Sequence, residues 1–216
     1  MRKFLFALCL VVFSTELSAQ TMRRIWIQMP DSIVPYLTES NRTELADYVT
    51  MEMESAVRNL LKDTTRITVL LDNYVDVELS SSSRLQIKLL PWAGDRSVAV
   101  DSILCVVTTY RGPSAESKIA FYSRLWEPLR IASPVASTGF TDAIETYVQR
   151  PDSISESDYR DLISPLDMHL LVMELSPRDD SLCLHLSLPS MAREEAIRIE
   201  PLLLQRKLKW NGQRFN

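Results

Sequence analysis

The sequence predicts an α+β protein built of two tandem units, each with helices followed by an antiparallel sheet. Two observations predict this class: paired segments in which apolar and polar residues alternate, and one hairpin pattern that occurs twice. Residues 75–91 and 171–189 both contain Glu-Leu-Ser, then a polar bend, then an alternating strand that ends at a proline. The second unit should be smaller or less regular, because a helical pattern follows its hairpin where the first unit continues with long strands.

Residues 1–19 have the pattern of a cleaved signal peptide. A basic start precedes about ten apolar residues and a small-residue cleavage site that ends at Ala19. The apolar run is too short to span a bilayer, which takes about 20 residues. No later segment has the length of a membrane-spanning helix. We therefore expect an exported protein that resides in the periplasm, at the cell surface or outside the cell.

Charge and cysteine content narrow the partner classes. The formal net charge is −4 and no basic run is present, whereas nucleic-acid binding needs clustered Lys and Arg. Two cysteines follow the leader, Cys105 and Cys183. An oxidising compartment would allow a disulfide between them, but a free cysteine also packs as a small apolar residue. Both states stay open at this point.

The first half begins with a helical pattern. Asn41 as N-cap, Glu44 in a capping box and an apolar stripe at a period of 3.6 residues predict an amphipathic helix over 41–61. A short helical turn is expected just before it, at Ser32–Leu37. After Asp63 the period falls to two, which predicts strands at 67–70, 75–79, 85–89, 102–110 and 118–123.

The strand residues also predict which way side chains face. In the first hairpin, apolar residues should point into a core and the polar row should point to solvent. That row comprises Asp76, Glu78, Gln86 and Lys88, with Asp72 nearby. The strand 102–110 is apolar on both faces at its centre, so we expect it in the middle of the sheet. Pro91 should end its strand, since proline cannot donate to a sheet.

The second half repeats this order after a Ser/Pro/Gly-rich linker at 132–140. Helices are predicted at 141–148 and 155–162, with another near 191–204 that is interrupted at Pro201, and strands at 169–175, 182–188 and 207–215. Asn211-Gly212 suits a type I′ turn. The expected organisation is a signal peptide (1–19), a first unit (20–131), the linker (132–140) and a second unit (141–216). Duplication explains the repeated hairpin, although alternating hairpins also resemble one another by convergence.

Two resemblances support this organisation. The order of elements resembles that of the beta-lactamase inhibitor protein over most of the chain, but no inhibitory motif can be matched. More specifically, four segments resemble an uncharacterised family of exported proteins of Bacteroidales: YLTESNRTELADYV (36–49), DNYVDVELSSSSRLQIKLLP (72–91), SKIAFYSRLW (117–126) and LKWNGQRF (208–215). The second resemblance implies export and a shared fold, and it implies no activity.

No recognisable catalytic or cofactor motif is present. The sequence lacks a G-x-S-x-G elbow, an H-E-x-x-H pair and a glycine-rich phosphate loop. Cys183 and His185 should share one face of a strand. They take the places of Gln86 and Lys88 in the first hairpin, so we predict a partly exposed pair and no metal site. His169 has no recognisable partner, and we expect no cofactor.

The leading functional hypothesis is a non-enzymatic binding or protein-interaction module of the cell envelope. Trp92, Tyr110, Arg111 and Trp126 are the candidate contact residues, because Trp, Tyr and Arg are enriched in binding hot spots. Alternatively, each of these aromatics covers the edge of its own core. Two other functions stay open: an envelope-acting hydrolase that uses paired carboxylates, and a carrier of a small ligand at the seam between the units. The sequence indicates neither a particular partner nor an oligomeric state.

Overall fold

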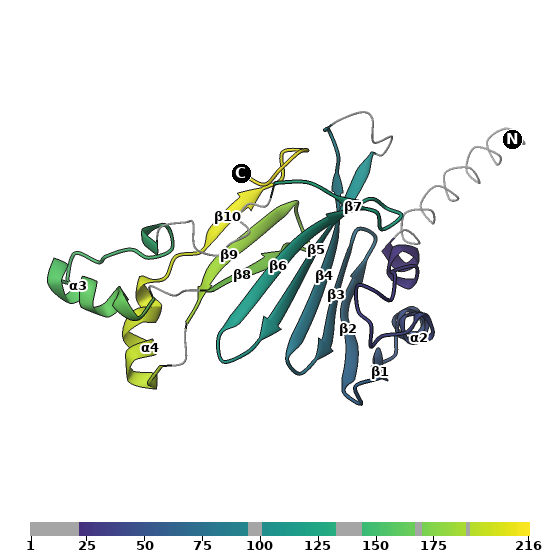
Figure 1. Ribbon diagram of the computed structural model, residues 1–216, viewed down its shortest axis with the longest axis horizontal. Coiled ribbons are helices and arrows are strands. Elements are labelled where there is room, and N and C mark those ends of the chain that lie inside the picture. Colours follow the sequence, from purple (N-terminus) through teal and green to yellow (C-terminus); the bar gives the residue numbers. More distant parts are fainter. Residues whose placement is uncertain (1–21, 95–100, 133–143, 167–169, 189–190) are drawn as a thin grey trace, which may run out of the picture.

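The computed structural model describes residues 22–94, 101–132, 144–166, 170–188 and 191–216. Within them the chain forms helices and two antiparallel sheets, which confirms the α+β class (Figure 1). The first sheet is a meander of seven strands in chain order, and the second has three strands in the order β10-β9-β8. The predicted signal peptide, most of the predicted linker and His169 lie outside the described residues.

The strands match most of the predicted segments. The first sheet comprises β1 (Ala56–Arg58), β2 (Thr64–Leu71), β3 (Tyr74–Ser80), β4 (Ser83–Pro91), β5 (Ser102–Arg111), β6 (Ala115–Tyr122) and β7 (Pro128–Leu129). The second sheet comprises β8 (Leu170–Leu175), β9 (Ser181–Ser187) and β10 (Arg206–Lys209). The two Glu-Leu-Ser hairpins fold as β3–β4 and β8–β9, which belong to different sheets. The short edge strands β1 and β7 were not predicted.

The first helix is shorter than predicted. Residues 22–27 are helical, and α2 runs from Glu39 to Thr50. The N-cap is Thr38 and not Asn41. The Thr38 hydroxyl accepts a hydrogen bond from the backbone N–H of Asn41 at 3.2 Å. The predicted continuation to residue 61 is wrong, because the chain turns at Glu52 (φ 56°) and enters β1. Met53 and Leu60, which extended the apolar stripe, are exposed.

Both faces of the seven-stranded sheet are covered. The helical residues 22–27 and α2 pack on one face, in a core that includes Trp26, Leu45, Val77, Ile87 and Val106. The second sheet packs on the other face, where β8 contacts β4, β5 and β6. The core between the sheets includes Tyr74, Cys105, Phe121, Met173 and Leu184.

This second layer corrects the prediction for the polar row. Asp76, Gln86 and Lys88 are 6%, 2% and 1% exposed, although the alternating pattern placed them in solvent. The covering strands come from a distant part of the chain, so the local pattern carried no sign of them. Of the remaining acids, Glu78 is half-buried and Asp72 is exposed.

The helices of the second half flank the smaller sheet. They are α3 (Glu156–Ile163), α4 (Arg193–Ile199) and three short 3₁₀ turns, at Ile144–Thr146, Ser164–Leu166 and Glu200–Leu202. Trp210 pairs with Phe215 across the Asn211-Gly212 bend. Gly212 alone has a positive φ there (95°), so the bend is not the predicted type I′ turn, which needs positive φ at both central residues. The Gly212 carbonyl accepts from Ala93 N–H at 2.8 Å, and a Cβ at Gly212 would come within 2.8 Å of the Ala93 side chain.

Candidate functional site

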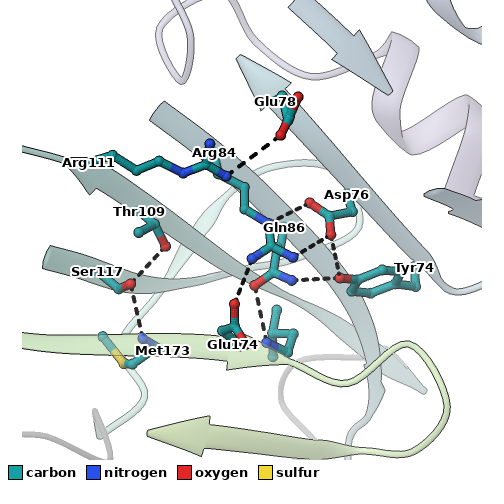
Figure 2. Close-up of polar contacts among 11 residues, drawn as sticks. Tyr74, Asp76, Glu78, Arg84, Gln86, Thr109, Arg111, Ser117, Met173 and Glu174 are labelled. Atoms are coloured by element: carbon teal, nitrogen blue, oxygen red, sulfur yellow. Dashed lines mark hydrogen bonds and ion pairs between the residues drawn. The ribbon is translucent and has the colours of Figure 1, made fainter. Parts of the chain in front are cut away.

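A connected network of polar side chains lies where the two sheets meet. We define the inter-sheet seam as Tyr74, Asp76, Arg84, Gln86 and Ser117 of the first sheet, with Met173, Glu174 and Leu175 of β8. Figure 2 shows Arg84 and Glu174 pointing toward each other across the seam, and Ser117 pointing at the backbone of Met173. Met173 and Leu175 take part through their backbone N–H groups. Pairing of Asp76 with Gln86 across β3 and β4 places the first members side by side on one face.

Arg84 is the centre of the charged part of the seam. Its guanidinium donates to both oxygens of Asp76, from Nε at 2.9 Å and from a terminal nitrogen at 2.7 Å. The other terminal nitrogen donates to Glu174 Oε1 at 2.7 Å. The hydrogen bond and charge of Asp76 raise the pKa of Arg84, so the cation persists at every physiological pH. The ion pair with Glu174 connects the first sheet to β8.

Gln86 is the centre of the neutral part. Its amide nitrogen donates to the Tyr74 hydroxyl at 2.6 Å, and that hydroxyl is 3.2 Å from Asp76 Oδ2. Burial and the charge of Asp76 raise the pKa of Tyr74, which keeps the phenol protonated and able to donate. The Gln86 carbonyl oxygen accepts from the backbone N–H of Leu175 at 3.2 Å.

A second bond of the same kind lies along β8. Ser117 Oγ accepts from the backbone N–H of Met173 at 3.0 Å and is 2.7 Å from the Thr109 hydroxyl. Met173 and Leu175 lie two residues apart on β8, so their N–H groups point to the same side, away from β9. Side chains of one sheet thus satisfy the open edge of the other, which would otherwise leave buried donors without partners.

This geometry decides what the seam can do chemically. The carboxylates of Asp76 and Glu174 converge, but they converge on Arg84. Both oxygens of Asp76 and Oε1 of Glu174 already accept hydrogen bonds from Arg84. The polar groups of the seam therefore bond to one another, and these bonds join the two sheets.

Lys88 extends the seam toward the bend between β8 and β9. Its ammonium lies 4.0 Å from Asp180 Oδ1, 3.5 Å from the Pro177 carbonyl and 5.8 Å from the centre of the Tyr74 ring. Burial lowers the pKa of Lys88, and the charges of Asp180 and Asp179 partly offset that effect. The side chain is enclosed between the sheets.

The structure does not bring the four predicted contact residues together. Pairing of Pro91 with Ser102 and of Ser83 with Tyr110 places Trp92 and Tyr110 at opposite ends of β4–β5. Tyr110 is 49% exposed and lies under the Lys118 ammonium. Arg111 forms an ion pair with Glu78 at 3.7 Å.

The two tryptophans belong to the cores. Trp92 is half-buried, with its ring centre 6.3 Å from that of Trp210. Trp126 is 6% exposed and donates from its indole nitrogen to the Ile25 carbonyl at 3.1 Å. The burial of Trp126 agrees with the alternative that this aromatic covers its own core, because its ring packs between the sheet and the first helical residues. The preceding residue, Leu125, is the exposed one.

The turn that contains Trp126 presents Leu125 to solvent. Leu125 is 81% exposed. Ser123 closes the turn: its backbone N–H donates to Glu127 O at 2.8 Å, and its hydroxyl accepts from the N–H groups of Leu125 and Glu127 at 3.2 Å. Trp126 adopts φ 66°, a left-handed conformation that is a rare outlier for a bulky residue. The buried indole of Trp126 holds the turn in this conformation.

A groove of about 490 Å³ lies beside Leu125. Its apolar walls include Ile27, Met29 and Pro30, and its charged groups are Asp31, Glu39, Arg42 and Arg124. We call Leu125 together with this groove the Leu125 surface. Arg42 is 2% exposed and builds the floor: it donates to the Ile27 and Leu37 carbonyls and to Asp31 Oδ1, the last at 2.9 Å. These bonds fix the segment before α2 against the helix.

Comparison with known proteins places the chain in a family. Residues 14–215 match the family model described as "Protein of unknown function (DUF3256)". The chain belongs to the DUF3256 family. This agrees with the predicted likeness to an uncharacterised family, while the likeness to the beta-lactamase inhibitor protein stays a prediction. No curated protein matches the chain.

A solved structure shares the DUF3256 fold described above. It is a domain of an uncharacterised protein from Porphyromonas gingivalis W83, with a TM-score of 0.67 and 22% sequence identity. The match covers 91% of this chain and 98% of that one. At this identity the likeness shows the fold alone.

The remaining candidates in this DUF3256 member are the cysteines and histidines. Cys105 and Cys183 are both free, and Cys105 is fully buried. Cys183 and His185 are partly exposed on the outer face of β9, as predicted. Cys183 Sγ lies 3.7 Å from Gln205 Oε1. Within the described part of the chain, no three His, Cys, Asp or Glu side chains gather as a metal site would require.

Proposed function

We propose that this chain is an exported, non-enzymatic interaction module of the cell envelope, and that it contacts a partner protein through the Leu125 surface. The exposure of Leu125 carries the proposal. A left-handed backbone at a bulky residue costs of order 1–3 kcal/mol, and such strain persists where the surrounding structure enforces it. Here the Trp126 indole and the Ser123 hydroxyl enforce it, and the result is an apolar side chain held out in water.

The surroundings of Leu125 also support contact with a protein. Burying a leucine side chain contributes roughly 1.5–3 kcal/mol, and protein–protein interfaces have an apolar core inside a polar rim. The groove next to Leu125 combines apolar walls with charged groups at its rim.

Export rests on the leader pattern of residues 1–19. No helix in the described ranges has the length and apolarity to cross a bilayer.

Affinity capture tests this function. The protein, purified after export, is immobilised and incubated with cell-envelope extract, alongside Leu125→Ser and Leu60→Ser variants. Leu60 is the matched control, because it is 65% exposed in another loop. We expect one protein to be retained in stoichiometric amount by the wild type and by Leu60→Ser, and to be lost with Leu125→Ser. Equal retention by all three would refute the Leu125 surface as the contact.

Turnover would overturn the non-enzymatic part of the proposal. The same preparation is offered a panel of peptide, glycan and phosphoester substrates. Asp76→Asn serves as the test variant, because Asp76 is the most buried carboxylate of the seam. Hydrolysis by the wild type and not by Asp76→Asn would establish the hydrolase alternative.

A further inference from the structure

The Leu125 surface has charges of both signs that lack partners. Asp31 and Arg42 pair with each other. Glu39 is exposed and Arg124 is half-buried, and neither forms an ion pair among the described residues although both line the groove. One anion and one cation are thus left over on the same surface. An entirely basic or entirely acidic partner would meet one like charge here.

The Leu125 surface also combines an apolar projection with a groove that could receive such a projection. Leu125 projects, and Ile27, Met29 and Pro30 line the open groove beside it. A side chain cannot fill the groove next to its own turn while it stands 81% exposed in solvent. A second molecule with the same projection could fill it.

We infer that the partner of the Leu125 surface is a second copy of this chain, related by a two-fold axis. This inference rests on the proposed function and names its partner. A two-fold interface is self-complementary, since each residue i that contacts j is matched by a contact of j with i. The axis sets each Leu125 into the groove of the other copy. It also sets each Arg124 against the partner's Glu39, so that the two leftover charges are paired twice.

Sedimentation velocity over a range of concentrations measures this association. Four proteins are compared: wild type, Arg124→Glu, Glu39→Arg and the double charge swap. Each single reversal places two like-charged contacts in the dimer, so we expect its dissociation constant to rise at least about tenfold, and the double swap to return within about threefold of wild type. Leu125→Ser should abolish the dimer over the same range. Circular dichroism confirms that every variant is folded.

The outcomes separate this inference from the proposed function. A wild type that stays monomeric up to about 100 µM, a concentration at which weak specific complexes are populated, overturns the second-copy inference. If envelope capture then still depends on Leu125, the proposed function stands with another partner. A dimer that tolerates all three charge variants forms through another surface and equally overturns the inference.

Discussion

The side-chain carbonyl of Gln86 accepts the backbone N–H of Leu175 at 3.2 Å, so a residue in the middle of one sheet closes the edge of the other. Ser117 does the same for Met173. Edge strands with unpaired donors invite pairing with other chains. In this fold the edge of β8 is directed at the first sheet and is satisfied there, which joins the two sheets into one structure.

Replacing Gln86 with leucine should destabilise the fold. The change keeps the shape but leaves the Leu175 N–H buried without an acceptor, at a cost of about 1–3 kcal/mol in the free energy of unfolding. Urea denaturation measures it. Gln149→Leu is the control, because Gln149 is exposed; its effect should stay within about 0.5 kcal/mol. Equal effects of the two changes would show that the seam bond contributes nothing.

The ion pair of Arg84 should behave as a coupled unit. Arg84→Met leaves Asp76 as a buried anion whose cation is gone, and we expect a loss of about 2–4 kcal/mol in unfolding free energy. Adding Asp76→Asn removes that anion, so the double variant should recover at least about 1 kcal/mol. A double variant less stable than Arg84→Met would contradict the assignment of Asp76 as the partner that needs Arg84.

Lys88 should make the free energy of unfolding depend on pH, and the direction of its pKa shift sets the sign. Because burial lowers its pKa below the ordinary 10.5, the unfolded chain holds more protons than the folded chain between the two pKa values. Stability of the wild type relative to Lys88→Met should therefore rise as pH increases through that window, and should be lowest at neutral pH. Urea unfolding of both proteins at pH 7 and pH 10 measures the difference. A relative stability that falls with pH would show that the amine is stabilised as a cation.

The two cysteines should differ in reactivity. Burial raises the pKa of both thiols, far more for Cys105, which is fully buried. A maleimide at pH 8 should label Cys183 slowly in the native protein and Cys105 only in denaturant, because the thiolate is the reactive form. Mass spectrometry reads the labels. Failure to label either thiol in denaturant without a reductant would reveal a disulfide.

Local pattern predicted much of this fold and little of its surfaces. Alternation located the strands from β2 to β6 because each is formed from neighbouring residues of the chain. It could not show that Gln86 and Lys88 are buried, since the strands that cover them lie some 90 residues away. Helical periodicity also overran residue 50, where Met53 and Leu60 continued the stripe without contributing to a core.

The sequence analysis named Trp126, which is next to Leu125 in the chain, but it did not name Leu125 itself. Trp126 attracted attention as an aromatic residue after a strand, and it lies on the wall of the groove. Yet the residue it exposes is Leu125, and nothing in a leucine next to a tryptophan tells which of them is buried. That choice depends on the positive φ at Trp126 and on the distant Ile25 carbonyl. Turn geometry of this kind is set by tertiary contacts.

Photo-crosslinking in intact cells is the most direct test of the central claim that the Leu125 surface makes the functional contact. Benzoylphenylalanine is introduced at position 125 in one strain and at position 60 in another, both positions being exposed. We predict a discrete crosslinked product from position 125, containing a second copy of the chain, and none from position 60. A product from position 60 with none from position 125 would contradict the account.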